Sequence, residues 1–273
     1  MLLYKYMPGP RFFSNFMFRF TPAEDLNDPK ELVPDIRLRD PGAYAQDITR
    51  RNIERAYFSV LLSNPDFTPA EAWARCVAAA KQIEQQFDPI AKVRELYETF
   101  MRTTNRNVGV LSLTEDPCSA PMWAHYANEY KGLVIGLDSD SEFFLPKPEE
   151  PRVCGQLMNV LYTDTSPVVY VEPGQLDIPK EVFFTKARSW DYEKEWRIIK
   201  YLPQASEVAD SPEGKKIHLF DVPPEAVKEV IFGSKISADM QEQVEQALQA
   251  RAPHVLRKRV TFAPSDGLRV VDC

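Results

Sequence analysis

Polar and apolar residues alternate from Glu195 to Ile198, and Trp196, Ile198, Ile199, Tyr201 and Leu202 favour a β-strand. If this strand includes Glu193, then Glu193, Glu195 and Arg197 share one face. In a helix the two glutamates would lie about 200° apart. Two carboxylates on one strand face repel each other, which raises the pKa of at least one unless Arg197 or Lys186 compensates. The sequence therefore predicts a carboxylate pair; the alternative is a solvated Glu–Arg surface.

Short apolar runs bounded by proline, glycine or polar residues predict strands on both sides of a long helical region. The predicted strands are 2–6, 16–20, 108–113, 133–137, 153–162, 216–220, 227–233, 255–262 and 268–271. Residues 40–103 have helical spacing, and helices are also predicted at 122–126, 178–188 and from 237 to 248. Because strands and helices rarely alternate, we expect a single α+β domain with a mixed, mostly antiparallel sheet core. Residues 40–103 form a helical insertion or subdomain within it.

Length and composition are those of an ordinary globular protein. The chain has 273 residues, of which 44% are hydrophobic and 27% charged. No apolar run reaches the length of a membrane span and the N-terminus lacks a signal-peptide pattern, so we expect a cytoplasmic protein without a membrane partner. The net charge of -7 argues against a broad nucleic-acid surface, although Arg257-Lys258-Arg259 can contribute to a local basic patch.

Several common enzyme classes lack their motifs in this sequence. The four cysteines have no metal-type spacing and only three histidines occur, so we expect no bound metal. A glycine-rich phosphate loop and a G-x-S-x-G turn are both missing. These observations disfavour a Rossmann dehydrogenase, a P-loop ATPase and an α/β-hydrolase.

Three motifs occur together along the chain. They are Leu26-Asn-Asp-Pro29, Met122-Trp-Ala-His-Tyr126 followed by Lys131-Gly132, and Trp190-x-Tyr-Glu-x-Glu-Trp-Arg197. With Tyr4-Lys-Tyr6 and Glu229-Val-Ile-Phe-Gly233, this set resembles a bacterial family described as domain of unknown function 2971. The resemblance covers nearly the whole chain and is weakest over residues 40–103. It implies no particular activity.

A strand with Glu-x-Glu after an aromatic-rich loop also resembles the catalytic strand of ADP-ribosyltransferases. This second resemblance implies NAD as a substrate, Glu195 as the catalytic carboxylate and Glu193 as its partner. Ser112-Leu-Thr114 would correspond to the Ser/Thr motif of a middle strand. Tyr4 or Lys5 would take the first-strand role, where that superfamily usually has arginine or histidine.

The same resemblance places aromatic residues around the nicotinamide. His125 and Tyr126 would flank its pocket, and Trp123, Tyr126 and Trp190 would offer faces for stacking. Their residue types alone favour core packing for the two tryptophans and a structural role for His125. Because histidine titrates near neutral pH, His125 is also a candidate general base.

Basic residues and a rigid corner complete the predicted site. Lys186 and Arg188 would hold the pyrophosphate by charge, although cations near a helix C-terminus are also favourable in themselves. Asn27, in the corner Asn27-Asp28-Pro29, belongs to a loop that can line a pocket. We expect one cleft to contain Asn27, His125, Lys186, Trp190 and Glu195.

The sequence therefore favours an ADP-ribosyltransferase-like enzyme. Its carboxylate would stabilise the positive charge that develops on the ribose of NAD when nicotinamide leaves. The acceptor would be an unidentified protein or nucleic acid, in phage defence or as the target of a toxin. Two alternatives remain open: an NAD-independent nuclease or hydrolase using His125, Lys186 and Glu195, and a non-catalytic module that binds a nucleotide or a protein.

Overall fold

The structure, a computed structural model, describes residues 1–146, 151, 153–263 and 267–273. The chain divides into two compact units. The first contains residues 1–32, 103–165 and 183–273, and the second contains residues 33–102 and 166–182. The fold is α+β with a large mixed, mostly antiparallel sheet, so the predicted fold class is confirmed.

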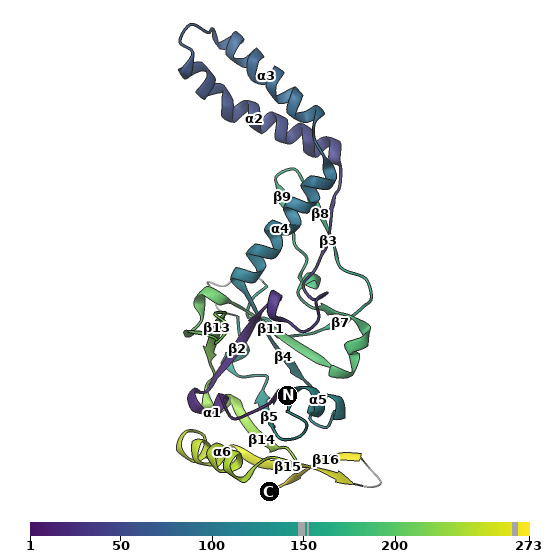
Figure 1. The fold of residues 1–273 in the computed structure, drawn as a ribbon, viewed down its shortest axis with the longest axis vertical. Helices are drawn as coiled ribbons and strands as arrows, with labels where there is room; N and C mark the ends of the chain where they lie inside the picture. Colours follow the sequence, from purple (N-terminus) through teal and green to yellow (C-terminus); the bar gives the residue numbers. More distant parts are fainter. Residues whose placement is uncertain (147–150, 152, 264–266) are drawn as a thin grey trace. The chain divides into compact units, whose positions relative to one another are not determined.

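The large sheet lies in the first unit (Figure 1). In sheet order its strands are β12 (Glu207–Asp210), β13 (Lys216–Asp221), β2 (Met17–Pro22), β4 (Val108–Thr114), β1 (Leu2–Met7), β5 (Leu133–Asp138), β14 (Val227–Phe232), β15 (Leu256–Ala263) and β16 (Gly267–Asp272). Two further strands lie off this order: β11 (Glu195–Tyr201) pairs with β4 and with β6 (Met158–Asn159). These neighbours are antiparallel except β14 and β15, which helix α6 (Ala238–Arg251) connects. A parallel pair needs such a crossover connection.

The sheet branches at β4. Along one edge β4 pairs with β11 over its whole length, from Tyr201 opposite Val108 to Glu195 opposite Thr114. Along the other edge it pairs with β2 near its start, at Gly109 and Val110, and with β1 only at Thr114. Among the described register pairs, none joins residues 111–113 of β4 to β1 or β2. Strands β1 and β2 therefore diverge along this edge of β4 and leave an opening in the sheet between them.

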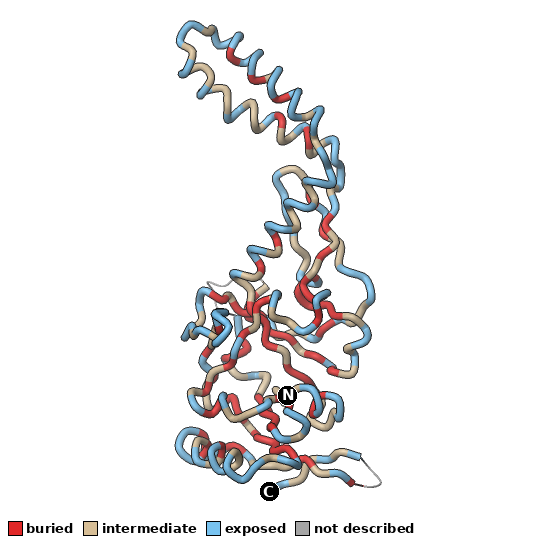
Figure 2. The backbone as a smooth tube through the Cα atoms, in the orientation of Figure 1, coloured by how far each residue is buried: buried red, intermediate tan, exposed pale blue. Residues whose placement is uncertain are grey.

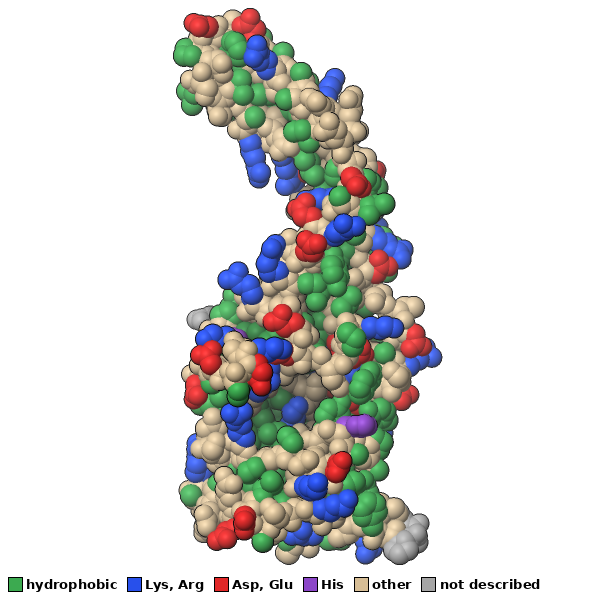
Figure 3. Space-filling view, in the orientation of Figure 1, with side chains coloured by type: hydrophobic (Ala, Val, Ile, Leu, Met, Phe, Trp, Pro, Cys, Tyr) green, Lys and Arg blue, Asp and Glu red, His purple; other side chains and the backbone are tan. Residues whose placement is uncertain are grey.

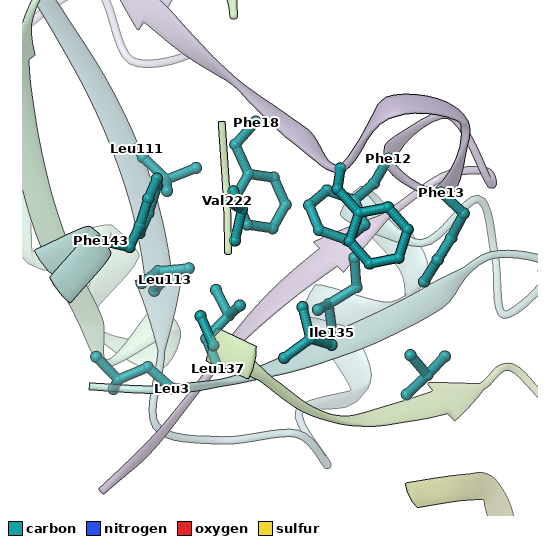
Figure 4. Packing of buried hydrophobic residues seen from close by; sticks show 14 of the residues in the cluster. Leu3, Phe12, Phe13, Phe18, Leu111, Leu113, Ile135, Leu137, Phe143 and Val222 are labelled. Carbon is teal, nitrogen blue, oxygen red and sulfur yellow. The ribbon is translucent and has the colours of Figure 1, made fainter. Parts of the chain in front are cut away.

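A core rich in phenylalanine packs against the sheet (Figure 4). Phe12 of the short helix α1 (Phe12–Asn15) stacks on Phe18 of β2, with ring centroids 4.5 Å apart. Helix α6 covers part of this core through Val244 and Leu248. In Figure 2 buried positions concentrate in the strands of this unit. The core holds the strands that carry the candidate site.

The second unit contains a three-stranded sheet and long helices. Its elements are β3 (Asp35–Leu38), α2 (Pro41–Ser63), α3 (Pro69–Gln85), β8 (Val168–Glu172), β9 (Gln175–Leu176), η3 (Lys180–Val182) and most of α4 (Pro89–Asn107). The Asp40 side chain caps α2 by accepting a hydrogen bond from the Ala43 amide. Thr68 and Glu71 form a capping box at the start of α3. The helices predicted over residues 40–103 are therefore confirmed, and α4 extends to Asn107.

Two predicted elements differ in the structure. Residues 178–188 are not a helix: they form η3 and the strand β10 (Thr185–Lys186), which pairs in parallel with β7 (Leu161–Tyr162). Residues 153–162 contain the short strands β6 and β7 rather than one strand. The backbone groups of Thr185 and Lys186 bond to a neighbouring strand, and local sequence does not reveal that strand.

Short helices complete the first unit. They are η1 (Ala23–Asp25), α5 (Ala120–Tyr126), η2 (Glu142–Phe144), η4 (Arg188–Glu193), η5 (Leu202–Gln204) and η6 (Pro224–Ala226). None of the helices within the described residues is long and apolar enough to span a membrane.

Candidate functional site

Glu193 and Glu195 belong to different elements. Glu193 ends the 3-10 helix η4, Lys194 adopts a left-handed conformation with φ of 44°, and Glu195 begins β11. The prediction that both glutamates lie on one strand face is therefore wrong. The left-handed residue changes the direction of the chain between them. Their carboxylates nevertheless meet, because both bind Lys186.

Lys186 lies between three buried carboxylates. Its Nζ is 2.6 Å from Oε2 of Glu193, 3.1 Å from Oε2 of Glu195 and 3.2 Å from Oε1 of Glu31. The side chain of Lys186 is only 3% exposed. The loop after Asn27-Asp28-Pro29 supplies Glu31, whose amide donates to the Asp28 carbonyl. One lysine thus joins Glu31, which is far away in the sequence, to Glu193 and Glu195, which follow Lys186 by seven and nine residues.

Arg197 completes the group on the β11 side. Its Nε donates to Oε1 of Glu195 at 2.9 Å, its Nη1 donates to the Phe183 carbonyl at 2.8 Å, and its Nη2 binds Oε2 of Glu31. The Arg197 side chain is fully buried. We call Glu31, Lys186, Glu193, Glu195 and Arg197 the buried ion cluster.

The cluster keeps Glu195 ionised. Burial alone would raise the pKa of Glu195, but Arg197 and Lys186 outweigh it and lower the pKa to about 2. The Ser112 hydroxyl adds to this lowering. Burial raises the pKa of Glu31 despite the same two cations. Glu195 therefore carries a negative charge throughout the physiological pH range, and on acidification Glu31 takes up a proton before Glu195 does.

A pocket of about 230 Å³ lies at the opening between β1 and β2. Its lining residues are Tyr4, Lys5, Tyr6, Thr21, Asp25, Leu26, Asn27, Val110, Ser112, Leu113, Met122, Tyr126, Lys186, Glu193 and Glu195. Figure 3 shows a hollow in the surface of this unit, with lysine or arginine side chains (blue) in and beside it. The pocket thus presents one face of the buried ion cluster, while Glu31 and Arg197 are not among its lining residues.

A chain of hydrogen bonds connects the rim of the pocket to the cluster. Asn27 donates through Nδ2 to the Tyr126 hydroxyl at 2.7 Å, and that hydroxyl donates to Oε1 of Glu193 at 2.7 Å. Burial, followed by Glu193, raises the pKa of Tyr126 well above its ordinary value. The phenol therefore stays protonated and continues to donate. This arrangement fixes Glu193 from two sides, through Tyr126 and Lys186.

Lys5 brings a third cation into the pocket. Its Nζ donates to the Ser112 carbonyl at 2.9 Å. Burial lowers the pKa of Lys5 to about 8, although Glu195 and Glu193 act in the opposite direction. With Lys5 charged, three cations offset the three carboxylates, so the interior is electrically balanced. Above that pKa the interior gains a net negative charge.

Replacing Lys5 with methionine is expected to raise the free energy of unfolding by about 1–2 kcal/mol at pH 7. The variant no longer has to bury a charged amine, and this gain exceeds the loss of the one hydrogen bond that Lys5 donates. Between pH 8 and the ordinary lysine pKa the unfolded state binds more protons than the folded state. Wild-type stability therefore rises with pH in this window, and the advantage of Lys5→Met shrinks. Urea unfolding at pH 7 and pH 10 measures both effects.

The control is Lys131→Met, which replaces an exposed lysine and should change the free energy of unfolding little. A Lys5→Met protein that is less stable than wild type at pH 7 would contradict the prediction.

The pocket brings together most of the residues selected from the sequence. Its lining includes Tyr4, Lys5, Asn27, Ser112, Tyr126, Lys186, Glu193 and Glu195. His125, Trp123, Arg188 and Trp190 are not among the lining residues. Of the five residues expected in one cleft, Asn27, Lys186 and Glu195 line this pocket.

Trp123 and Trp190 have packing contacts instead. Trp123 is fully buried, donates through Nε1 to the Pro117 carbonyl and makes an edge contact with Tyr6. A ligand in the pocket therefore has no face of Trp123 on which to stack. Trp190 contacts the buried ion cluster without lining the pocket, since Nζ of Lys186 lies 5.0 Å from its ring centroid.

His125 and Arg188 are exposed residues outside the pocket. His125 lies in helix α5, one residue before Tyr126, and successive helical residues point about 100° apart. Arg188 lies 3.7 Å from the exposed Asp164. Lys186, in turn, is fully engaged by three carboxylates. Neither member of the predicted pyrophosphate pair is therefore placed to bind a phosphate in this pocket.

Sequence reasoning missed two residues of the site. Glu31 follows Asp28-Pro29, where the sequence indicates a turn. Nothing in the sequence shows that its carboxylate is buried against Lys186 and Arg197. The hydroxyl of Tyr162 accepts a hydrogen bond from the Glu195 amide at 2.7 Å. Tyr162 belongs to β7, which pairs with the strand that carries Lys186.

Other charged groups bind within the protein. In the predicted basic patch, Lys258 binds Glu229, Arg257 binds Glu245 and Arg259 binds Gln241. The two glutamates reduce the positive charge that the patch offers to a nucleic acid, and the neutral Gln241 occupies an Arg259 donor. Within the described part of the chain, no group of three or more histidine, cysteine or acidic side chains could hold a metal ion.

One comparison with known proteins matches part of this site. Searches of curated proteins and of solved structures found no match. The family model described as a protein of unknown function (DUF2971) matches residues 122–198. This stretch includes α5, Lys186 and the segment from Trp190 to Arg197. The resemblance to this family of unknown function is therefore confirmed over residues 122–198.

Proposed function

We propose that the pocket binds the nicotinamide end of NAD and that the protein is an ADP-ribosyltransferase-like enzyme. One observation supports this above the others: Lys5, Ser112 and Glu195 come from the neighbouring strands β1, β4 and β11 and line one pocket. These are the three strand roles that the resemblance to ADP-ribosyltransferases implies. The sheet opening between β1 and β2 gives a ligand access to them.

The proposed reaction breaks the bond between nicotinamide and ribose. The bonding electron pair leaves with nicotinamide, and positive charge develops on the ribose. An acceptor nucleophile then forms a bond to the same carbon and loses its proton to a base or to solvent. The ionised Glu195 stabilises this positive charge more in the transition state than in the ground state. Because its pKa is lowered to about 2, the Glu195 carboxylate stays ionised across the physiological pH range.

The neighbouring groups have supporting roles in this proposal. Glu193, fixed by Tyr126 and Lys186, would accept a hydrogen bond from a ribose hydroxyl. Tyr4 and Tyr6 offer aromatic surface to the nicotinamide ring. The acceptor is a protein or a nucleic acid, and modification of such a target fits a role as a toxin or in phage defence.

Release of nicotinamide from NAD tests this function. Purified protein is incubated with NAD, first alone and then with bacterial protein and nucleic-acid fractions as acceptors. Nicotinamide should appear with the wild-type protein and should increase with the fraction that contains the acceptor. A protein that neither binds NAD nor releases nicotinamide with any fraction contradicts the proposal.

A non-catalytic binding module is the second candidate. It is favoured by the occupancy of Glu195, whose two carboxylate oxygens bind Arg197 and Lys186 and whose side chain is only 1% exposed. In such a module the cluster would serve only to shape the pocket. NAD would then bind without nicotinamide release. The nuclease alternative loses support because His125 does not line the pocket.

A further inference from the structure

The outer face of β2 continues the pocket toward solvent. Side chains alternate along this strand, so Arg19 and Thr21 share one face while Phe18 and Phe20 point into the core. Thr21 lines the pocket. Arg19 is therefore on the pocket face of β2, two residues from the lining.

Asp25 holds two cations at this edge of the pocket. Asp25 itself lines the pocket, and its side chain is only 9% exposed. Its Oδ2 accepts from Nη2 of Arg19 at 2.6 Å, and its Oδ1 binds Nζ of Lys215. The Arg19 and Lys215 side chains are 41% and 60% exposed. Both cations are thus fixed at the rim, with a large part of each facing solvent.

The backbone around Lys215 fixes its position. Lys215 follows Gly214, which has φ of 77°, in the turn between β12 and β13. The Lys215 amide donates to the Ser211 hydroxyl and its carbonyl accepts from the Ser211 amide. Asp25 is the main cause of the raised pKa of Lys215, and Glu24 raises this pKa by a smaller amount. The Glu24 carboxylate accepts a hydrogen bond from Asn105.

The pocket is too small to enclose a whole dinucleotide. Its volume of about 230 Å³ is below the roughly 300–1,000 Å³ of sites that bury most of a drug-sized ligand. A ring bound beside Glu195 would leave the rest of the ligand at the rim. Inside, Lys186 is occupied by carboxylates, whereas the guanidinium of Arg19 has five N–H donors and is partly exposed. Besides Lys5, which is inside the pocket, the available cations therefore lie where the ligand leaves it.

From this geometry we infer that Arg19 and Lys215, held by Asp25, form a subsite for the phosphate groups of the bound nucleotide. The inference rests on the proposed function and specifies which part of the ligand determines affinity. A guanidinium and an ammonium on one carboxylate keep N–H donors for phosphate oxygens. The subsite replaces the predicted pair of Lys186 and Arg188. It distinguishes nucleotides from nucleosides that carry the same ring.

Calorimetric titration with NAD and with nicotinamide riboside, which has no phosphate, tests this inference. Arg19→Gln and Lys215→Met should each raise the Kd for NAD about tenfold, because each removes a charge-assisted contact. Neither should change the Kd for nicotinamide riboside. Lys216→Met is the matched control, because Lys216 is 62% exposed and pairs with Asp210 instead. It should leave both constants unchanged.

Each outcome has a separate meaning. A tenfold loss for NAD alone supports the phosphate subsite. If wild type, Arg19→Gln and Lys215→Met bind NAD equally well, the subsite inference is wrong and the proposed function stands. If the wild-type protein does not bind NAD at all, the proposed function is wrong, and the subsite inference is overturned with it. Circular dichroism checks that these surface variants are folded.

Discussion

Replacing Arg197 with methionine is expected to lower the free energy of unfolding by about 3–5 kcal/mol at pH 7. Arg197 is fully buried and binds Glu195, Glu31 and the Phe183 carbonyl. Without it, three buried carboxylates share Lys186, and the carbonyl loses its donor. Methionine fills much of the space, so loss of charge compensation rather than a cavity dominates the effect. Urea unfolding followed by tryptophan fluorescence measures it.

The control for this variant is Arg37→Met. Arg37 also binds a carboxylate, Asp35, but its side chain is 57% exposed. Exposed ion pairs contribute about 0–1 kcal/mol, so this variant should remain close to wild type. If Arg197→Met is no less stable than Arg37→Met, the buried ion cluster does not stabilise the fold in the way described here.

The pH dependence of Arg197→Met gives an independent check. In the wild type the lowered pKa of Glu195 stabilises the folded protein above the ordinary glutamate pKa, and this contribution is lost as the pH falls toward about 2. Without Arg197 the pKa of Glu195 rises, so protonation relieves the unpaired charge at a higher pH. The stability difference between variant and wild type should therefore be largest near neutral pH and should shrink in mild acid.

The second large effect is expected for Glu195→Gln in nicotinamide release. If Glu195 stabilises positive charge on the ribose, the neutral amide should lower the rate by about 10²–10³-fold, as measured for the loss of other electrostatic groups. The readout is nicotinamide formed from saturating NAD, so that a change in kcat is separated from a change in KM.

Glu31→Gln is the matched control for Glu195→Gln. Glu31 binds the same two cations, Lys186 and Arg197, and is equally buried, but it does not line the pocket. Glu31→Gln should cost less stability than Glu195→Gln, because the pKa of Glu31 is raised in the fold whereas that of Glu195 is lowered. Glu31→Gln should also keep its rate within about tenfold of wild type. Equal rate losses in the two variants would mean that Glu195 acts through folding alone.

The sequence predicted most of the fold because local signals and burial agree. The capping residues Asp40 and Thr68 precede helices α2 and α3 in the region predicted to be helical, and apolar runs form the central strands. The prediction failed at residues 178–188, where Thr185 and Lys186 join a two-stranded parallel sheet. There the partner strand, which is distant in sequence, decides the conformation.

The site was predicted in part for a similar reason. Residue type and order pointed to Lys5, Ser112 and Glu195, which do line one pocket. The sequence did not show that Lys194 is left-handed, so Glu193 was placed on the wrong element. It also did not show which way α5 faces: Tyr126 contacts the pocket, whereas Trp123 packs into the core. Side-chain direction in so short a helix depends on tertiary packing.

The buried ion cluster connects the stability of the fold to the proposed chemistry. Arg197 and Lys186 lower the pKa of Glu195 and so maintain the charge that the reaction needs. Removing either cation costs stability, whereas removing the costly charge of Lys5 is expected to increase it. A stabilising substitution that impairs ligand binding would be the usual trade-off between stability and function at a binding site.

Calorimetric titration of NAD into wild-type protein and Lys5→Met tests the central claim most directly, because binding requires no acceptor. Lys5 lines the pocket beside Ser112, and its replacement is expected to leave a folded, more stable protein. We expect saturable binding of NAD to wild type at pH 7, weakened at least about tenfold in Lys5→Met because methionine has no N–H group to donate to the part of the ligand inside the pocket. Absence of binding, or equal binding by both proteins, would contradict it.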